Sequence, residues 1–359
     1  MPGLKTNKQS DFNPYWQGML ADYVTAIAWS PKGHYLAATS AAGEVSLLNI
    51  KSQHLTVLQE SSGQSMDCVA FSQDGKFLAA AGQQGQVKIW QLQQSESPVL
   101  ITTLETRSTW VDRLAWSPTH PYLAFQLGFC MQIWDADQAQ VVETLSLDAT
   151  AQDLGWHPDG QALAIAVKNT IRIWNTQTWE LEHDWETAAP SSAITWSPDG
   201  NYIAAGGLDR TLMVWQWGVE YPWQMQGFPG KVSQLAWSDQ ASSSDAPLLV
   251  ASSADGMVRW EKDRDEQIGW NATELKHHHE KVSAIAFQPQ SFLLASASKD
   301  GQLCLWHHAK TLSLTLEGAP NGFSCLAWNP AGHQIAAGGQ SGELFIWSKV
   351  LRGQGFGQH

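Results

Sequence analysis

The sequence predicts an all-β fold in which eight similar units close into a ring. Its 359 residues contain eight copies of one pattern, which start near residues 24, 66, 111, 151, 192, 232, 282 and 323. Each copy holds three short segments with the two-residue alternation of β-strands, and a further alternating segment follows. No segment has the periodicity of an amphipathic helix. Units of four antiparallel strands that recur about every 40 residues are typical of the blades of a β-propeller.

The elements of each unit follow in a fixed order. The first strand, as in VTAIAW, ends at an anchor aromatic, and these are Trp29, Phe71, Trp116, Trp156, Trp196, Trp237, Phe287 and Trp328. A turn with Pro and Gly follows, because tight turns need a fixed or a permissive φ. A second strand of the type Leu/Ile-Ala-Ala comes next, and a third strand is usually closed by Trp, as in VKIW. The fourth strand is the most variable, as in HLTVLQE or TLSLTLE.

The ring also needs a closing strand, because an unpaired sheet edge is a liability. The eighth copy ends at Trp347, and the residues after it form a poor strand. We therefore expect residues 12–20, including Trp16, to supply the outer strand of the last unit. The predicted propeller spans residues 11–350, with flexible ends at 1–10 and 351–359. A seven-membered ring with one displaced copy is the alternative.

Most of the tryptophans are explained by the repeat. Of 20 Trp residues, 13 are anchor or closing residues of strands, where large aromatic side chains fill the space between neighbouring blades. Five others lie in or near the outer strands of the fourth to sixth units: Trp179, Trp185, Trp217, Trp223 and Trp270. They either pack against the next blade or line an apolar lateral groove for a partner. In the fifth unit, residues 217–225 alternate as one strand face would.

Composition excludes several classes of protein. Asp and Glu outnumber Lys and Arg by 34 to 21, so the net charge of −13 disfavours binding to nucleic acids or attachment to anionic membranes. There is no signal peptide and no apolar run of about 18 residues, which favours a cytoplasmic protein. The four Cys residues form no C-x-x-C motif, so we expect neither a disulfide scaffold nor a zinc ribbon, and no cofactor.

The repeats resemble the WD-repeat (tryptophan–aspartate repeat) β-propeller family, and the segment LLASASKDGQLCLW, which ends at Trp306, is the most similar to the family pattern. Only Trp134-Asp135 keeps the dipeptide that gives the family its name. The resemblance implies a structural tetrad in the seventh unit, formed by His278, Ser296 or Ser298, Asp300 and Trp306.

The resemblance also implies a function. WD-repeat propellers are typically non-catalytic scaffolds or adaptors, so we expect a monomer that binds a protein or peptide partner through the loops of its top face. Aromatic and basic residues are the types that anchor such contacts on an acidic molecule. The candidates are Arg107, Trp110, Arg113, Phe129, Lys168, Arg210, Phe228, Lys231 and Lys299.

A propeller enzyme of the hydrolase or lactonase type is the alternative function. It would use a metal or carboxylates in the central channel, where Asp67, Asp112 and Asp153 occur at matching positions of consecutive units. The triplet His277–His279 and the pair His307–His308 are expected at opposite ends of the seventh unit, too far apart to share a metal ion. We therefore predict no metal site there.

Overall fold

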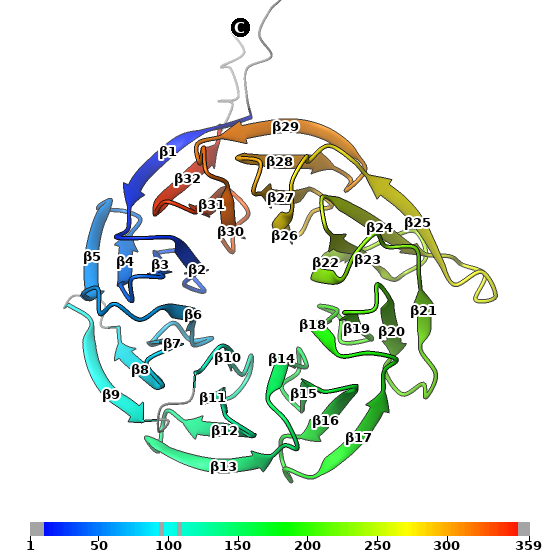
Figure 1. The fold of residues 1–359 in the computed structure, drawn as a ribbon, viewed down its shortest axis with the longest axis horizontal. Coiled ribbons are helices and arrows are strands. Elements are labelled where there is room, and N and C mark those ends of the chain that lie inside the picture. Colours follow the sequence, from blue (N-terminus) through cyan, green and yellow to red (C-terminus); the bar gives the residue numbers. More distant parts are fainter. Residues whose placement is uncertain (1–10, 93–96, 106–109, 351–359) are drawn as a thin grey trace, which may run out of the picture.

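The computed structural model describes residues 11–92, 97–105 and 110–350, and shows eight four-stranded antiparallel sheets arranged around a central axis (Figure 1). The predicted all-β propeller is confirmed, and the seven-membered alternative is wrong. The first strand of each blade lies at the centre of the ring and the fourth lies at the rim (Figure 1). The predicted flexible ends, 1–10 and 351–359, lie outside the described residues.

The first half of the ring consists of blades 1 to 4. Blade 1 comprises β2 (Val24–Trp29), β3 (Tyr35–Ser40), β4 (Val45–Asn49) and β5 (His54–Gln59). Blade 2 comprises β6 (Met66–Phe71), β7 (Phe77–Gly82), β8 (Gln86–Gln91) and β9 (Val99–Glu105). Blade 3 comprises β10 (Leu114–Trp116), β11 (Tyr122–Leu127), β12 (Cys130–Asp135) and β13 (Gln140–Ser146). Blade 4 comprises β14 (Ala151–Trp156), β15 (Ala162–Val167), β16 (Thr170–Asn175) and β17 (Leu181–Glu186).

The second half consists of blades 5 to 8. Blade 5 comprises β18 (Ser191–Trp196), β19 (Tyr202–Gly207), β20 (Leu212–Gln216) and β21 (Trp223–Met225). Blade 6 comprises β22 (Val232–Ala241), β23 (Pro247–Ser253), β24 (Gly256–Lys262) and β25 (Trp270–Leu275). Blade 7 comprises β26 (Val282–Phe287), β27 (Leu294–Ser298), β28 (Gln302–His307) and β29 (Thr311–Glu317). Blade 8 comprises β30 (Phe323–Trp328), β31 (Gln334–Gly339), β32 (Glu343–Lys349) and β1 (Phe12–Met19).

The antiparallel order of the strands gives the ring two distinct faces. The turn between the second and third strands and the loop that leads into the next blade lie at the same end of each blade, because successive strands reverse direction. We call this end the top face. The turns between the first and second strands and between the third and fourth strands form the bottom face.

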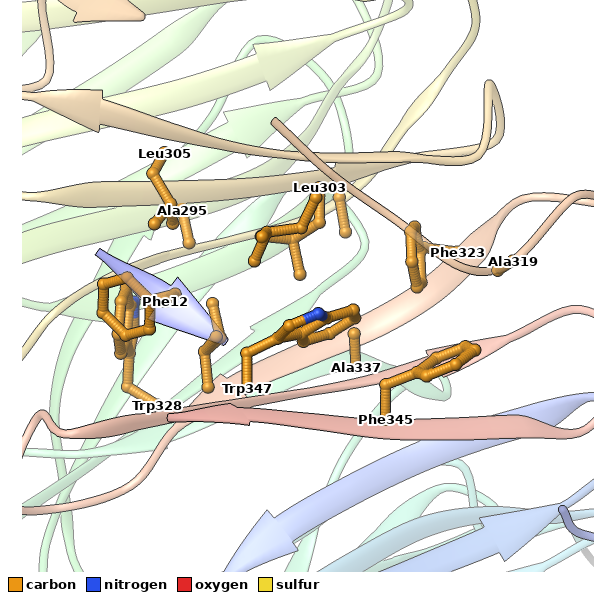
Figure 2. Close-up of a cluster of buried hydrophobic side chains, with 13 residues drawn as sticks. Phe12, Ala295, Leu303, Leu305, Ala319, Phe323, Trp328, Ala337, Phe345 and Trp347 are labelled. Carbon is orange, nitrogen blue, oxygen red and sulfur yellow. The ribbon is translucent and has the colours of Figure 1, made fainter. Parts of the chain in front are cut away.

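The ring is closed by its N-terminal strand, as predicted. β1 pairs with β32 in a register that runs from Phe12 opposite Lys349 to Met19 opposite Glu343, with an irregularity at Pro14–Trp16. Phe12 is 3% exposed, and its ring lies 5.6 Å from that of Trp328. Figure 2 shows Phe12 in one cluster with Trp328 and Trp347 of blade 8 and with residues of blade 7 such as Leu305. The first strand therefore becomes part of the hydrophobic core between the last two blades.

The anchor tryptophans form hydrogen bonds between neighbouring blades and also fill the space between them. Each anchor Trp donates its indole N–H to the backbone carbonyl of the residue that precedes the anchor aromatic of the previous blade, at 3.0–3.2 Å. The donors are Trp29, Trp116, Trp156, Trp196, Trp237 and Trp328. The bond from Trp29 to Ala327 crosses the point where the ring closes. The two units with an anchor Phe have no such donor.

The five tryptophans of the outer strands pack between blades. Trp270 is buried and the other four are half-buried. Trp185 of blade 4 stacks on Trp215 of blade 5 with ring centroids 5.3 Å apart. The expectation that residues 217–225 form one strand face is wrong, because β20 ends at Gln216 and β21 begins at Trp223. Between them, Gly218 has a φ of +80° and Tyr221 is 77% exposed in a turn of the bottom face.

Candidate functional site

A chain of hydrogen bonds braces blade 7. His278, in the loop that enters the blade from the top, lies 2.9 Å (Nδ1) from Asp300 Oδ2 and 2.8 Å (Nε2) from Ser296 Oγ. Trp306 on β28 donates its indole N–H to the same Ser296 Oγ at 2.9 Å. Ser298, the other candidate, instead donates to the carbonyl of Glu280 and accepts from the N–H of Asp300. Ser296 is therefore the hydroxyl of the tetrad.

The direction of these bonds fixes the protonation of His278. The indole of Trp306 can only donate, so the proton of the Ser296 hydroxyl is left for Nε2 of the imidazole. A carboxylate only accepts, so Nδ1 carries the proton that is donated to Asp300. A neutral imidazole satisfies every member of the chain, which makes the tetrad a structural brace.

The pKa values of the pair agree with this neutral state. Burial lowers the pKa of His278 below its ordinary value, against the opposing effect of Asp300. Burial alone would raise the pKa of Asp300, but the hydrogen bonds from His278 and from the backbone N–H groups of His279 and Gln302 outweigh it and lower that pKa.

Blade 6 replaces the tetrad with apolar residues. Val232 pairs with Ser253 as Val282 pairs with Ser298 in blade 7, so the positions of the two blades can be matched. By this register Phe228 replaces His278 and Ala251 replaces Ser296. Trp260 closes the third strand of blade 6 as Trp306 does in blade 7. Asp255 follows Ser253 by two residues as Asp300 follows Ser298, although the turn of blade 6 is one residue shorter.

The replacement changes both ends of the brace. The ring of Phe228 lies 6.1 Å from that of Trp260, whose indole nitrogen is buried without a hydrogen-bond partner in the described structure. Phe228 is 5% exposed, so it is not the exposed surface side chain that the sequence predicted. Its side chain belongs to the core because it packs where a tetrad histidine would lie.

Arg113 also lies elsewhere than predicted. Its Nε donates to the carbonyl of Gln152 at 2.9 Å and lies 3.3 Å from Asp153 Oδ1, so the guanidinium joins blade 3 to blade 4. The other oxygen of Asp153 accepts the backbone N–H of Ile194 in blade 5 at 2.8 Å. Arg113 is thus held by inter-blade contacts, while 41% of its side chain remains exposed.

The carboxylates of the central channel do not gather into a metal site. Burial raises the pKa of Asp67 and of Asp153, and Arg113 opposes the shift in both. Asp67 accepts a hydrogen bond from Ser65. No group of three or more His, Cys, Asp or Glu side chains in the described part of the chain is placed to hold a metal ion.

The two histidine groups of blade 7 lie at opposite faces, as their places in the topology require. His277 contacts Gln302 through Nε2 at 3.1 Å, near the top. His308, in the bottom turn after β28, stacks on Phe292 with ring centroids 5.8 Å apart. Each group therefore has neighbours of its own.

Two exposed aromatic side chains lie over blade 3 on the top face. Trp110, in the loop that enters the blade, is 59% exposed, and Phe129, in the turn between β11 and β12, is 63% exposed. Among the basic candidates, Lys168 and Arg210 occupy the corresponding turns of blades 4 and 5 and are exposed. Lys231 and Lys299 are exposed over blades 6 and 7. Arg107 lies outside the described residues.

The basic side chains in these turns of blades 4 and 5 differ in their partners. Lys168 Nζ lies 2.9 Å from Asp148 Oδ2, and Arg172 also contacts this carboxylate, at 3.0 Å. Arg210 has no ion pair with any residue that the structure describes. Its φ of +71° holds the turn in a left-handed conformation. Of the two, only Arg210 offers an uncompensated charge to a partner.

A pocket of about 670 Å³ that the repeat pattern did not predict lies on the top face of blade 6. The loop before β22, the turn between β23 and β24 and the loop after β25 form its walls. Apolar side chains and titratable side chains both line it. The only signal in the sequence is that blade 6 has Phe228 at the position where the tetrad of blade 7 has a histidine.

No helix with the length and hydropathy needed to cross a membrane occurs within the described ranges. The four Cys residues, all within those ranges, are free thiols. Burial raises the pKa of Cys304 to about 12 and that of Cys325 to about 11. These thiols are poor nucleophiles because they stay protonated at neutral pH.

The structure is that of a tryptophan-rich propeller repeat protein. Its eight blades pack against one another through tryptophans, and blade 7 contains a hydrogen-bonded tetrad. Five segments match the family model of the WD domain, G-beta repeat: residues 17–47, 52–91, 180–216, 269–307 and 310–348. They cover more than half of the chain. The chain belongs to the WD40 repeat family. The matches leave out β9 to β16 and β21 to β24, where the sequence departs from the family pattern.

Similar proteins and structures agree with this assignment. The chain is 29% identical over 149 residues to the periodic tryptophan protein 2 homolog of Dictyostelium discoideum, and 29% identical over 143 residues to periodic tryptophan protein 2 of Arabidopsis thaliana. Each match covers 38% of this chain but only 15% of the relative's length. The crystal structure of Sqt1 from Chaetomium thermophilum superposes with a TM-score of 0.81 at 17% identity, over 94% of this chain and 99% of that one. At this identity the superposition shows a shared fold.

Proposed function

We propose that this protein is a non-catalytic scaffold or adaptor that binds a protein or peptide partner through the top face of blades 3 to 5. The observation that carries the proposal is the aromatic pair of Trp110 and Phe129, which are 59% and 63% exposed although most Trp residues of the chain are packed between blades. Exposed aromatic side chains on a rigid support are typical anchors of protein interfaces.

Exposed side chains in the top turn of blade 5 support the same proposal. Arg210 is exposed two blades away, and the neighbouring Leu208 of the same turn is 45% exposed. Exposed aromatic, apolar and arginine side chains are the residue types that anchor protein-binding surfaces. The partner that suits this part of the face presents apolar side chains and a carboxylate.

The propeller enzyme is the weaker alternative. A metal-dependent hydrolase needs an open cation site, but Arg113 already supplies the positive charge beside Asp153. Metal analysis of untagged protein tests this point. Stoichiometric metal would favour the enzyme, and a metal content far below one per chain would favour the scaffold.

We also propose a cytoplasmic location and a monomeric state for the protein alone. The free thiols suit a reducing compartment, because secreted proteins with several cysteines usually pair them. The net charge of −13 opposes association between copies. Fractionation of native cells and light scattering of the purified protein test these two statements.

The experiment that tests the proposed function is affinity capture from native cells with wild-type protein, Trp110→Ala and Arg210→Ala. Both side chains are exposed, so their removal leaves the blade cores intact. We expect the same specific partner with the wild type and a marked loss with both variants. An unchanged set of captured proteins with both variants would show that this part of the top face is not used.

A further inference from the structure

The pocket of blade 6 differs in chemistry from the aromatic pair of blade 3. Its floor consists of the buried side chains Phe228 and Met257, with the half-buried Val258 beside them. Phe228 contributes an apolar ring to this floor, whereas the matching residue of blade 7 is the polar His278. The pocket of about 670 Å³ is large enough to admit a side chain and part of the backbone that carries it.

One carboxylate at the rim of the pocket, that of Asp255, lacks the histidine partner that Asp300 has in blade 7. In blade 7, Asp300 is bound by His278 at 2.9 Å. In blade 6, Asp255 lies in the corresponding turn and lines the same pocket as Phe228, whose side chain cannot donate a hydrogen bond. Asp255 is exposed and has neither a hydrogen bond nor an ion pair within the described ranges, although the same turn in blade 7 is fully bonded.

The other charges of the pocket nearly cancel. Glu274 forms an ion pair with Lys276, and this pair is the main reason why the pKa of Lys276 is raised, with a further contribution from Asp255. Among the Asp, Glu and Lys side chains that line the pocket, two carboxylates, those of Asp255 and Glu274, stand against one ammonium group, that of Lys276. The pocket therefore keeps one negative charge above an apolar floor, on a molecule whose net charge is −13.

We propose that this pocket binds an arginine side chain of the protein or peptide partner. The methylene stem lies on Phe228 and Met257, and the guanidinium donates two hydrogen bonds to the carboxylate of Asp255. Arginine fits better than lysine because its planar guanidinium pairs with a carboxylate in a bidentate manner and stacks on rings such as the imidazoles of His277 and His279. The inference rests on the proposed function, since it names the residue by which a partner of the top face is anchored.

Two variants separate the charge of the pocket from its volume. Asp255→Asn removes the negative charge at constant size. Gly256→Leu fills the pocket: this glycine lines it, its φ is not positive, and a Cβ there would meet only the carbonyl oxygen of Ser253 at 3.8 Å. The leucine therefore adds volume without straining the backbone. Glu220→Gln is the matched charge control, because Glu220 is exposed in a turn of the bottom face.

The experiment selects heptapeptides displayed on phage against the wild-type protein and measures the selected peptides by fluorescence polarisation. We expect enrichment of sequences with one fixed arginine. Replacing this arginine by glutamine, or using Asp255→Asn or Gly256→Leu protein, should weaken binding about tenfold or more, since a hydrogen bond to a charged group is lost. Glu220→Gln should bind within about twofold of the wild type, as is usual for a remote surface charge.

Two results would overturn the inference: no enrichment of arginine, or selected peptides that bind the Asp255→Asn and Gly256→Leu proteins as well as the wild type. Trp110→Ala protein, measured with the same peptides, separates this failure from failure of the proposed function. Peptides that depend on Trp110 and not on the pocket would leave the scaffold proposal in place. Peptides that depend on neither site would contradict both proposals.

Discussion

At the scale of single residues, Ser296 links the two ends of the brace in blade 7. Its hydroxyl accepts from Trp306 and donates to His278, so Ser296→Ala leaves a buried donor and a buried acceptor without partners. The alanine itself fits, because Ala251 occupies the matching position of blade 6. We expect a loss of about 2–3 kcal/mol in the free energy of unfolding, measured by urea denaturation. Ser313→Ala, which removes one bond from an exposed serine on β29, is the control. A loss no larger than that of the control would contradict the brace.

The protonation of His278 predicts how stability depends on pH. Its pKa is lowered in the folded chain, so the unfolded chain takes up a proton that the folded chain resists. Stability is therefore complete above about pH 6.5, the ordinary pKa of histidine, and falls as the pH is lowered through that value. Asp300, whose pKa is also lowered, adds a second loss below about pH 4. Melting temperatures between pH 8 and pH 4 should fall more steeply for the wild type than for His278→Gln. Equal slopes between pH 7 and pH 5 would show that His278 is not the group responsible.

At the scale of strands, β1 holds the ring closed. Seven residue pairs join β1 to β32, and Phe12 enters the core between blades 7 and 8. Deletion of residues 1–20 exposes the edge of β32 and this core, so we expect a large fall in the melting temperature. Phe12→Ala should cost about 3–5 kcal/mol, the usual cost of truncating a buried phenylalanine. Gln17→Ala, an exposed position on the same strand, should change little. A melting temperature unchanged by the deletion would mean that the ring does not need this strand.

The strands were predictable from sequence because each unit repeats the same alternation eight times, so that one clear copy supports the others. The sequence also indicated the closing strand, because the residues after Trp347 form a poor strand and residues 12–20 precede the first unit. The turn at residues 217–222 was missed, because the run of Trp217, Val219, Tyr221 and Trp223 alternates like a strand while Gly218 reverses the chain. The hydrogen bonds from the anchor tryptophans were not predicted, because they depend on the distance between neighbouring blades and the sequence of one repeat does not show this distance.

At the scale of the whole molecule, the ring carries its candidate contacts on one face. Blade 3 presents Trp110 and Phe129, and blade 6 presents the pocket with Asp255. The sequence located the exposed aromatic pair because both residues fall between predicted strands on the top face. It misplaced Phe228 and Arg113, because a loop position in the repeat does not reveal whether a side chain turns into the core or reaches the next blade.

Binding of a partner by the top face of the ring can be measured as a dissociation constant. We compare the captured partner's dissociation constant for wild-type protein, Trp110→Ala/Phe129→Ala and Tyr221→Ala. Tyr221 is the matched aromatic control, because it is 77% exposed on the bottom face. We predict that the double variant weakens binding roughly 1,000-fold, since two buried aromatic anchors at about 2 kcal/mol each contribute about 4 kcal/mol, and that Tyr221→Ala binds like the wild type. Equal binding by the double variant and the wild type, or an equal loss with Tyr221→Ala, would contradict binding by the top face.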